Sequence, residues 1–264
     1  MNDRDLVPGL FSLAGQVAIV SGGAGLYGRH IAHALAGAGA HVVVAARDLA
    51  ACERTAQQLR ELGLAADALP LDLTSEESIV ALRDEVVSRH GHIDVLVNNA
   101  VARAGRTVRD TSAAEWAATS AVNSLGTFLI TRECGEQMVA QGSGVFINVA
   151  SIYGMVGPDF SIYGETGMTN PAFYAYDKGG MINFTRYLAM AYAPHGIRAN
   201  CISPGGLGTP DQPAEFVARY RAAVPLGRLA GAEDIKGPVV FLASAASAYV
   251  TGVNLPVDGG WTAK

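Results

Sequence analysis

The sequence predicts an α/β fold, in which residues 1–264 form one domain around a doubly wound parallel sheet of about seven strands with helices on both faces. Three observations support this prediction. Short apolar segments alternate with longer segments of helical periodicity along the whole chain. The first apolar segment continues directly into a glycine-rich turn and a helix. No linker or internal repeat divides the chain, so the alternation is expected to build a single sheet.

Composition excludes several classes of protein. At 264 residues the chain can bury a substantial core, and 50% of its residues are hydrophobic. A net charge of −5 argues against nucleic acid or an anionic membrane as a partner. No apolar run is long enough to span a membrane, and the first residues do not resemble a signal peptide.

The cysteines and histidines do not form a metal-binding pattern. Cys52, Cys134 and Cys201 are odd in number, widely separated and unpaired with any histidine. We therefore expect no metal site, and buried free thiols in a reducing compartment such as the cytoplasm.

The first strand is expected over residues 16–20 and the first helix over residues 29–37. Between them, Gly23-x-Gly25-x-x-Gly28 matches the dinucleotide-binding fingerprint in the strand–turn–helix context that it requires. Glycines let the backbone approach a pyrophosphate, and the helix N-terminus supplies amide donors. The alternative is a turn with only a folding role, but the flanking strand and helix favour cofactor binding.

The second strand, residues 42–46, ends at Arg47 and Asp48. An acid at this strand end would hydrogen-bond the ribose 2′-hydroxyl of NAD, whereas an arginine would accommodate the 2′-phosphate of NADP. Ala46 stands where the acid is usual, and Asp48 can act as the N-cap of a helix over residues 49–62. This pattern favours NADP over NAD.

The next two strands bring further polar residues to the same edge of the sheet. Residues 66–69 form a strand that leads to Asp72 and Leu73, and a helix with an apolar stripe follows. Residues 93–97 form the fourth strand, which ends at Asn98, Asn99 and Ala100. Side-chain amides here can tie a neighbouring strand and line a cofactor crevice, although an ordinary Asn-rich turn is the alternative.

The second half of the chain supplies the candidate catalytic groups. A helix over about residues 114–141 contains Asn123, which needs a hydrogen-bond partner if it is buried. The strand at 145–149 is followed by Ser151, whose hydroxyl is expected in the crevice, or else caps a loop. Later strands are expected at 198–202 and 254–257, a helix at 232–243, a long loop at 157–171 and a mobile segment at 211–225.

Tyr174 and Lys178 stand four residues apart at the start of a predicted helix, so they share one face. A free tyrosine has a pKa of about 10, which is too high for proton transfer at neutral pH. An ammonium held beside a phenol favours the phenolate and provides a usable general acid/base. By itself the pair could be a surface contact on an amphipathic helix. The residues around it make the catalytic interpretation the stronger one.

These landmarks together resemble the short-chain dehydrogenases/reductases from about Leu13 to Trp261, in the family's order. The resemblance implies a single-domain Rossmann fold, NADP or NAD as cofactor and a small-molecule substrate. It implies that Tyr174 is the acid/base, Lys178 lowers its pKa and binds the nicotinamide ribose, Ser151 holds the substrate oxygen, and Asn123 fixes a water in the proton relay. The implied cofactor contacts are Ser21, Gly22, Gly23, Gly25, Tyr27, Gly28, Arg47, Asp72, Leu73, Asn99, Ala100, Tyr174, Lys178, Pro204, Gly205, Leu207 and Thr209.

Some features depart from the usual family pattern. Ser21 replaces a threonine, Val101 replaces a glycine, and the segment from Ser151 to Tyr174 is longer than usual. The spacing of Gly22, Gly25 and Gly28 is similar to a branch that contains epimerases and dehydratases, so a non-redox enzyme remains an alternative. A cofactor-binding regulator without turnover is a further alternative, and the complete catalytic set argues against it.

The substrate is expected to be a polyol, a sugar or a similar small hydroxylated molecule, because the long loop is rich in hydroxyl, amide and carboxylate groups. Parts of the chain resemble bacterial gluconate 5-dehydrogenase-like and cell-surface sugar pathway members. The alternative is a 3-oxoacyl or cyclic ketone reductase with an aromatic pocket. Substrate contacts are expected from Ser151, Tyr153, Tyr163 and Glu165 in loops at about 152–173 and 205–225. The family resemblance also implies a homo-oligomer, either a tetramer or a dimer.

Overall fold

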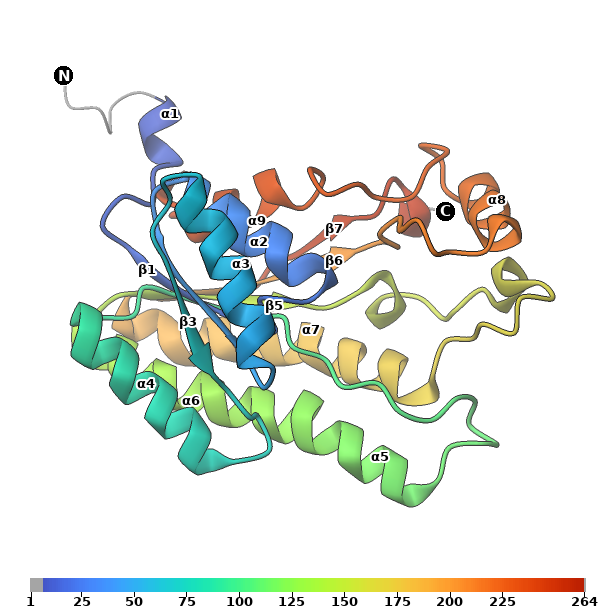
Figure 1. Cartoon of the computed structure of the whole chain (residues 1–264), viewed down its shortest axis with the longest axis horizontal. Coiled ribbons are helices and arrows are strands. Elements are labelled where there is room, and N and C mark those ends of the chain that lie inside the picture. Colours follow the sequence, from blue (N-terminus) through green and yellow to red (C-terminus); the bar gives the residue numbers. More distant parts are fainter. Residues whose placement is uncertain (1–6, 264) are drawn as a thin grey trace.

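The computed structural model describes residues 7–263, and at its centre is a seven-stranded sheet in the order β3-β2-β1-β4-β5-β6-β7 (Figure 1). Every neighbouring pair of strands is parallel. The strands are β1 Val17–Ser21, β2 His41–Ala46, β3 Ala66–Pro70, β4 Val95–Asn98, β5 Gly144–Val149, β6 Ile197–Pro204 and β7 Asn254–Val257. The chain winds outward from β1 in both directions, which confirms the predicted doubly wound fold.

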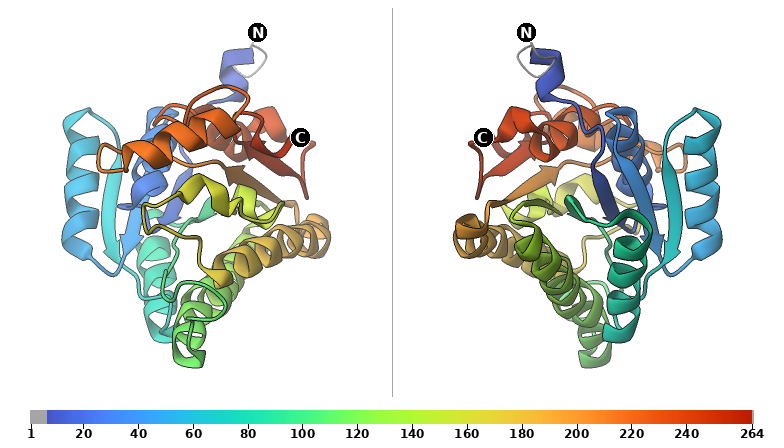
Figure 2. Two further views of the ribbon diagram at one scale, coloured as in Figure 1. Left: turned by 90° about the vertical axis from the view of Figure 1, so that its right-hand side faces the viewer. Right: turned by 90° about the vertical axis from the view of Figure 1, so that its left-hand side faces the viewer.

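Alternate side chains of each strand enter two separate cores, because successive Cβ atoms point to opposite faces of a sheet. In β1, Ala18 and Val20 pack into one core with α2 Leu26–Gly37, α3 Leu49–Glu61 and α9 Lys236–Ala243. Val17 and Ile19 pack into the other with α4 Glu76–His90, α6 Thr127–Gln141 and α7 Ala172–Tyr192. The two side views in Figure 2 show these helices on opposite sides of the sheet.

The predicted long helix at 114–141 is three segments in the structure. It consists of α5 Ala113–Ser120, a π-helical stretch Ala121–Gly126, and α6. At Gly126 the end of this stretch packs closely on Leu73, because a Cβ there would lie 2.5 Å from the Leu73 carbonyl oxygen. The wider π-helical turn carries Asn123, and such turns are frequent at functional sites.

The segment at 211–225, predicted to be mobile, contains the helix α8 Ala214–Ala223, which was not predicted. Phe216 and Tyr220 lie four residues apart and pack with Tyr163 and Trp261 in a third, aromatic cluster. This contact with distant residues stabilises the helix, so its local sequence alone did not reveal it. A short helix at α1 Val7–Leu10 was also not predicted.

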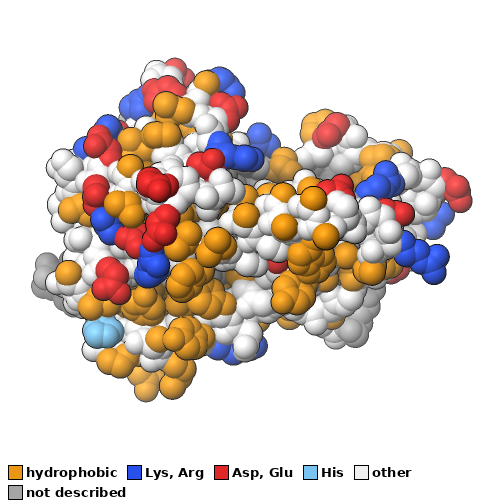
Figure 3. Space-filling view, turned by 90° about the horizontal axis from the view of Figure 1, so that it is seen from below, with side chains coloured by type: hydrophobic (Ala, Val, Ile, Leu, Met, Phe, Trp, Pro, Cys, Tyr) orange, Lys and Arg blue, Asp and Glu red, His pale blue; other side chains and the backbone are white. Residues whose placement is uncertain are grey.

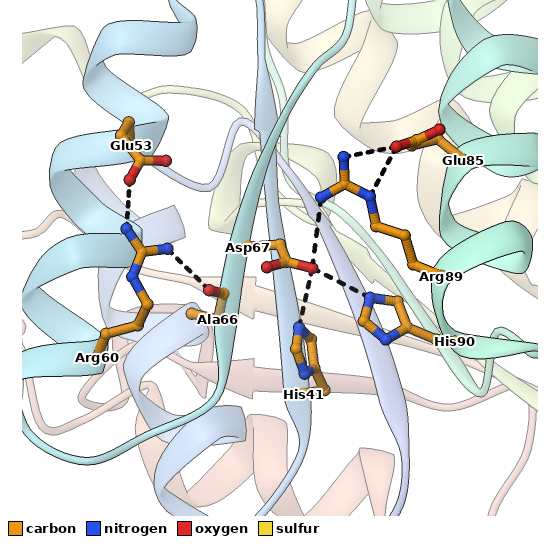
Figure 4. A network of polar contacts seen from close by, with 8 residues as sticks. All are labelled: His41, Glu53, Arg60, Ala66, Asp67, Glu85, Arg89 and His90. Atoms are coloured by element: carbon orange, nitrogen blue, oxygen red, sulfur yellow. Dashed lines mark hydrogen bonds and ion pairs between the residues drawn. The ribbon is translucent and has the colours of Figure 1, made fainter.

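Three polar residues connect β2, β3 and α4 at the end of the sheet opposite to the carboxyl ends of the strands (Figure 4). Asp67 Oδ2 lies 3.1 Å from His41 Nε2 and 3.1 Å from His90 Nε2. Burial alone would raise the pKa of Asp67, but the two imidazoles lower it below its ordinary value. The ligand-type atoms of these residues lie within 4.8 Å of one another, a grouping that sequence spacing did not reveal. Arg89 also pairs with Asp67 Oδ2, at 3.8 Å. The expected absence of a metal site stays a prediction.

Candidate active site

A cavity of about 630 Å³ lies at the carboxyl ends of the strands, where ligands bind in sheets of this kind. Most of the predicted site residues line it: Gly22, Gly25, Tyr27, Arg47, Asp72, Leu73, Asn99, Ala100, Ser151, Tyr153, Tyr163, Tyr174, Lys178, Pro204, Gly205 and Leu207. Six predicted site residues do not line it: Ser21, Gly23, Gly28, Asn123, Glu165 and Thr209. The cavity extends from the glycine-rich turn to the Tyr174 helix.

The glycine-rich turn is held in place by close backbone contacts. Gly22 has φ +62° and lies against Ala100, so a Cβ there would come within 2.8 Å of the Ala100 Cα. A Cβ on Gly28 would lie 2.1 Å from the Gly22 carbonyl oxygen. Asn99 Nδ2 donates to this same oxygen at 3.0 Å and to the Ser21 carbonyl at 3.1 Å. Asn99 therefore ties the turn to the end of β4, as predicted for an amide at this position.

Ser21 has a structural position rather than one on the cavity wall. Its hydroxyl donates to Val97 O and accepts from the amides of Asn99 and Ala100. The side chain is 1% exposed, behind the turn that it stabilises. Its contribution to a cofactor site is therefore indirect.

The first turn of α2 has the properties of a pyrophosphate site. Its N-cap residue, Gly25, makes no side-chain cap, and no acidic side chain occurs in the first turn. The orphan amides at this end can therefore donate to an anion, and the helix dipole favours negative charge. Tyr27 donates from its hydroxyl to Gly205 O at 2.9 Å, which joins this turn to the loop after β6. The residues present thus fit a dinucleotide.

The end of β2 presents an arginine to the cavity. Arg47 is exposed and lines the cavity beside Ala46. Asp48 is the N-cap of α3, because its Oδ1 accepts from Ala51 N at 2.9 Å, as predicted. Asp72 accepts from the amide and the hydroxyl of Thr74, and these hydrogen bonds lower the pKa of its carboxyl.

Ser151 follows the end of β5, Tyr174 and Lys178 lie in the first two turns of α7, and all three line one cavity. Lys178 is 4% exposed, its Nζ donates to Val149 O at 2.6 Å, and it lies 5.8 Å from the centre of the Tyr174 ring. Burial lowers the pKa of the Lys178 ammonium, while the neighbouring phenol opposes this shift. Ser151 is 5% exposed, and its Oγ accepts from Tyr153 N at 3.2 Å. A hydroxyl, a phenol and an ammonium therefore line one cavity, which could hold a reacting oxygen.

Asn123 lies beneath this group, outside the cavity wall. Its Oδ1 accepts from Ala102 N at 2.8 Å, and its Nδ2 donates to Ala102 O and to Asp177 Oδ2. The side-chain amide is therefore fully engaged with protein atoms. Asp177 was not predicted, although it stands directly before Lys178 and is only 8% exposed. Its carboxylate connects α7 to the π-helical turn, through Asn123 at 2.8 Å and Ser124 at 3.3 Å.

The long segment between Ser151 and Tyr174 is partly packed into the protein. Tyr163 stacks on Phe216 of α8, with ring centroids 5.9 Å apart and planes inclined by 8°. Burial raises the pKa of Tyr153 and Tyr163, so both phenols are neutral at pH 7. Glu165 is exposed and outside the cavity wall, so this structure does not place it at the substrate position.

Two residues that line the cavity, Arg103 and Asn170, were not predicted as substrate contacts. The guanidinium carbon of Arg103 lies 5.3 Å from the centre of the Tyr174 ring. Asn170 is 8% exposed, and its Nδ2 is buried without a hydrogen-bond partner. Neither belongs to a recognisable spacing pattern. The sequence signal was only their place in loops that follow strand ends.

Comparison with known proteins identifies the family. Residues 25–262 match the family model described as enoyl-(acyl carrier protein) reductase. The cis-4-hydroxycyclohexanecarboxylate dehydrogenase of Sinomonas cyclohexanicum is 37% identical, over 96% of this chain and 98% of that protein. The chain belongs to the short-chain dehydrogenase/reductase family. This confirms the predicted family and Rossmann fold.

Solved structures of family members agree with this placement. A gluconate 5-dehydrogenase from Burkholderia cenocepacia, solved with NADP and tartrate, has a TM-score of 0.87 and 31% identity, covering 97% of this chain and 98% of its own. An NAD⁺-bound xylitol dehydrogenase has a TM-score of 0.86 and 31% identity, covering 94% and 99%.

The chain is accordingly an NAD(P)-dependent oxidoreductase that acts on CH–OH groups. The similar proteins named here are dehydrogenases and a reductase, which supports the redox interpretation over the epimerase alternative. Within residues 7–263, none of the helices combines the length and hydropathy needed to cross a bilayer.

Proposed function

We propose that this chain interconverts the secondary alcohol and the ketone of a small polyol, sugar or alicyclic substrate, with NADP as the preferred cofactor. One observation carries the proposal: Ser151, Tyr174 and Lys178 line the same cavity as the glycine-rich turn. A substrate oxygen beside Tyr174 would thus lie next to the nicotinamide end of a dinucleotide bound at α2. The names of the similar proteins, which include a hydroxycyclohexanecarboxylate and a xylitol dehydrogenase, support a substrate of this size.

Each catalytic side chain has a distinct role in this proposal. Bound NAD(P) would accept or supply the hydride. In alcohol oxidation, the Tyr174 phenolate accepts the hydroxyl proton, and the Ser151 hydroxyl donates to the substrate oxygen. Lys178, whose Nζ donates to Val149 O and lies 5.8 Å from the centre of the Tyr174 ring, would hold a positive charge beside the phenol. Asn123 and Asp177 hold Ala102 and the start of α7 in position, and the relay water assigned to Asn123 stays a prediction.

The preference for NADP is inferred from charge at the end of β2. Arg47 is exposed and lines the cavity, and the neighbouring Asp48 is engaged as an N-cap. A cation therefore faces the position of the ribose 2′-substituent, where NADP carries a phosphate.

We also propose that residues 1–264 form one domain, whose loops at 152–173 and 205–225 enclose the substrate. Both loops contribute to one aromatic cluster, in which Tyr163 packs on Phe216. Ile162, Tyr163 and Asn170 from the first loop and Phe216 and Tyr220 from the second line the cavity. Movement of either loop would therefore change the substrate pocket.

We also propose that the chain forms a homo-oligomer in the cytoplasm. Figure 3 shows hydrophobic side chains gathered over the face that includes α6 and α7. Phe128, Tyr187 and Met190 on these helices are 46%, 66% and 79% exposed. Burial against a second copy would remove this apolar surface from water. The three thiols are buried and free, as expected in a reducing compartment.

The proposed function is tested with a panel of stereochemically defined polyols, sugars and alicyclic alcohols, each offered with NADP⁺ and NAD⁺. Absorbance at the nicotinamide band reports turnover, and the Tyr174→Phe variant is the matched control. We expect the wild type to oxidise at least one alcohol of the panel. The Tyr174→Phe variant should oxidise the same alcohol at no more than a trace of that rate. Equal turnover by both proteins would refute the assigned chemistry. Sedimentation of wild type and Met190→Glu tests the oligomer separately.

A further inference from the structure

A cation without a protein counter-ion lies beside the catalytic tyrosine. The Arg103 guanidinium lies over the Tyr174 ring, at 5.3 Å from its centroid. Among residues 7–263, the side chain of Arg103 has no ion pair and no hydrogen bond. The ring contact attracts the cation but does not neutralise its charge. The positive charge is therefore available to a ligand in the cavity.

The acidic residues of the cavity wall do not balance this charge. Within the described chain, Asp48 and Asp72 are the only carboxylates that line the cavity. They follow β2 and β3, whereas Tyr174 begins α7 beside β5 and β6, on the other side of β1 and β4. Asp48 and Asp72 also accept hydrogen bonds from Ala51 and Thr74. The part of the cavity around Tyr174 is thus cationic, with Arg103 and Lys178.

A second polar group on the cavity wall, the side-chain amide of Asn170, is buried without a hydrogen-bond partner. Asn170 lines the cavity four residues before Tyr174, is 8% exposed, and has no partner for its Nδ2. A buried amide donor without a partner is costly, and native structures rarely retain one without a reason. An acceptor supplied by a bound ligand removes this cost. Asn170 and Arg103 come from different loops, after β5 and β4, and both line the cavity that contains Tyr174.

We propose that Arg103 and the Asn170 amide form a carboxylate-binding subsite, so that the substrate is a hydroxy acid and the product its keto acid. A carboxylate offers two planar oxygens, which match the paired donors of a guanidinium and leave an acceptor for the amide. This inference rests on the proposed function, and it names the substrate class at the same site. Oxidation transfers a hydride from the carbinol carbon to NAD(P)⁺ and the hydroxyl proton to Tyr174, while the carboxylate is unchanged.

The subsite can be tested by binding alone, without turnover. The enzyme–NADP⁺ complex is titrated with cyclohexanecarboxylate and with the neutral isostere cyclohexanecarboxamide in a calorimeter. Neither probe has a hydroxyl group, so neither can react. The variants are Arg103→Gln and Asn170→Leu. Arg109→Gln is the matched control, because Arg109 is an exposed arginine of the same loop that does not line the cavity.

We expect wild type to bind the carboxylate more tightly than the carboxamide. Arg103→Gln should weaken carboxylate binding by about 10- to 100-fold, the range for a charge-assisted hydrogen bond, and change carboxamide binding by less than about threefold. Asn170→Leu should weaken carboxylate binding by about 5- to 10-fold, and Arg109→Gln should leave it unchanged. Circular dichroism and NADP⁺ affinity show that the variants remain folded.

Three results would overturn the subsite. Equal binding of carboxylate and carboxamide by the wild type removes the anion preference. An equal loss of carboxylate affinity in Arg103→Gln and Arg109→Gln would show that the net charge of the loop, and not the position of Arg103, determines binding. A fall in NADP⁺ affinity in Arg103→Gln, without a change in carboxylate preference, reassigns Arg103 to the cofactor. The proposed function is judged separately by oxidation of the alcohol panel, because a dehydrogenase of neutral alcohols would pass that test and fail this one.

Discussion

Replacing Gly28 by alanine tests whether close packing of the glycine-rich turn determines both stability and cofactor binding. The new Cβ would lie 2.1 Å from Gly22 O and 2.8 Å from Asn99 Nδ2. Real Cβ contacts are rarely shorter than 3.0 Å, so the Gly22 carbonyl must move by nearly the difference between 2.1 and 3.0 Å. That carbonyl accepts from Gly25 N and from Asn99, so the movement also strains two hydrogen bonds.

The magnitude follows from three contributions. Overpacking against a rigid neighbour costs about 1–3 kcal/mol, and weakening two hydrogen bonds adds about 1 kcal/mol. The higher helix propensity of alanine offsets up to about 1 kcal/mol of this destabilisation. We therefore expect Gly28→Ala to lower the free energy of unfolding by about 2 kcal/mol, which corresponds to about 4 °C in Tm for a chain of this length. Cofactor affinity should fall with it, because the displaced turn contains the amides expected to hold the pyrophosphate.

Gly37→Ala is the matched control in the same helix. A Cβ on Gly37 meets no atom within 4 Å, so only the propensity term remains. This variant should be more stable by up to about 1 kcal/mol. Urea denaturation at one protein concentration and titration of NADP⁺ measure both quantities for each variant. If Gly28→Ala is as stable as Gly37→Ala and binds NADP⁺ normally, the close-packing argument is wrong.

Three further predictions concern the site, and a fourth concerns the buried thiols. Tyr174→Phe should abolish turnover and leave NADP⁺ affinity nearly intact, whereas Lys178→Ala should reduce both; substantial kcat in Tyr174→Phe would exclude Tyr174 as the acid/base. Arg47→Ala should weaken NADP⁺ binding by about 10- to 100-fold and NAD⁺ binding much less, as titration of both cofactors would show. Asp177→Asn should lower kcat by about tenfold with little change in KM, since it disturbs the position of Asn123; an unchanged kcat at every pH would make Asp177 merely structural. Burial raises the pKa of the Cys52, Cys134 and Cys201 thiols to about 11, 12 and 11, above the value of 9.0 for a free thiol. The folded state then holds protons that the unfolded state loses, so Tm should fall as pH rises from about 9 toward 11, and a Tm constant over that range would contradict this linkage.

Much of the fold could be read from local patterns. All seven strands were predicted within about two residues of their observed ends. Central strands such as β1 and β4 are the clearest, because parallel strands buried on both faces are continuous apolar runs. The N-cap role of Asp48 followed from capping chemistry in the same way. The helix α8 was missed, since Phe216 and Tyr220 acquire their significance only from Tyr163 and Trp261, which are distant in sequence.

Of the predicted site, sixteen members line one cavity, while Asn123 and Ser21 lie behind its wall. The spacing of Tyr174 and Lys178 and the order of the landmarks were sufficient to assign the family. Sequence order cannot show which loops converge, so Arg103 and Asn170 were not recognised as parts of the site. Asp177 was not recognised because its partners, Asn123 and Ser124, are more than fifty residues away in the sequence.

The sequence by itself determined the parallel α/β architecture, the glycine-rich turn after β1, and the Tyr174 and Lys178 pair that we propose as catalytic. Each of these depends on residues within a few positions of one another, where periodicity and spacing carry the physical information. Only the tertiary structure showed that Arg103 lies over Tyr174 without a counter-ion and that the Asn170 amide is buried without a partner. Charge balance and hydrogen-bond satisfaction are properties of neighbours in space, and the fold chooses those neighbours from distant parts of the chain.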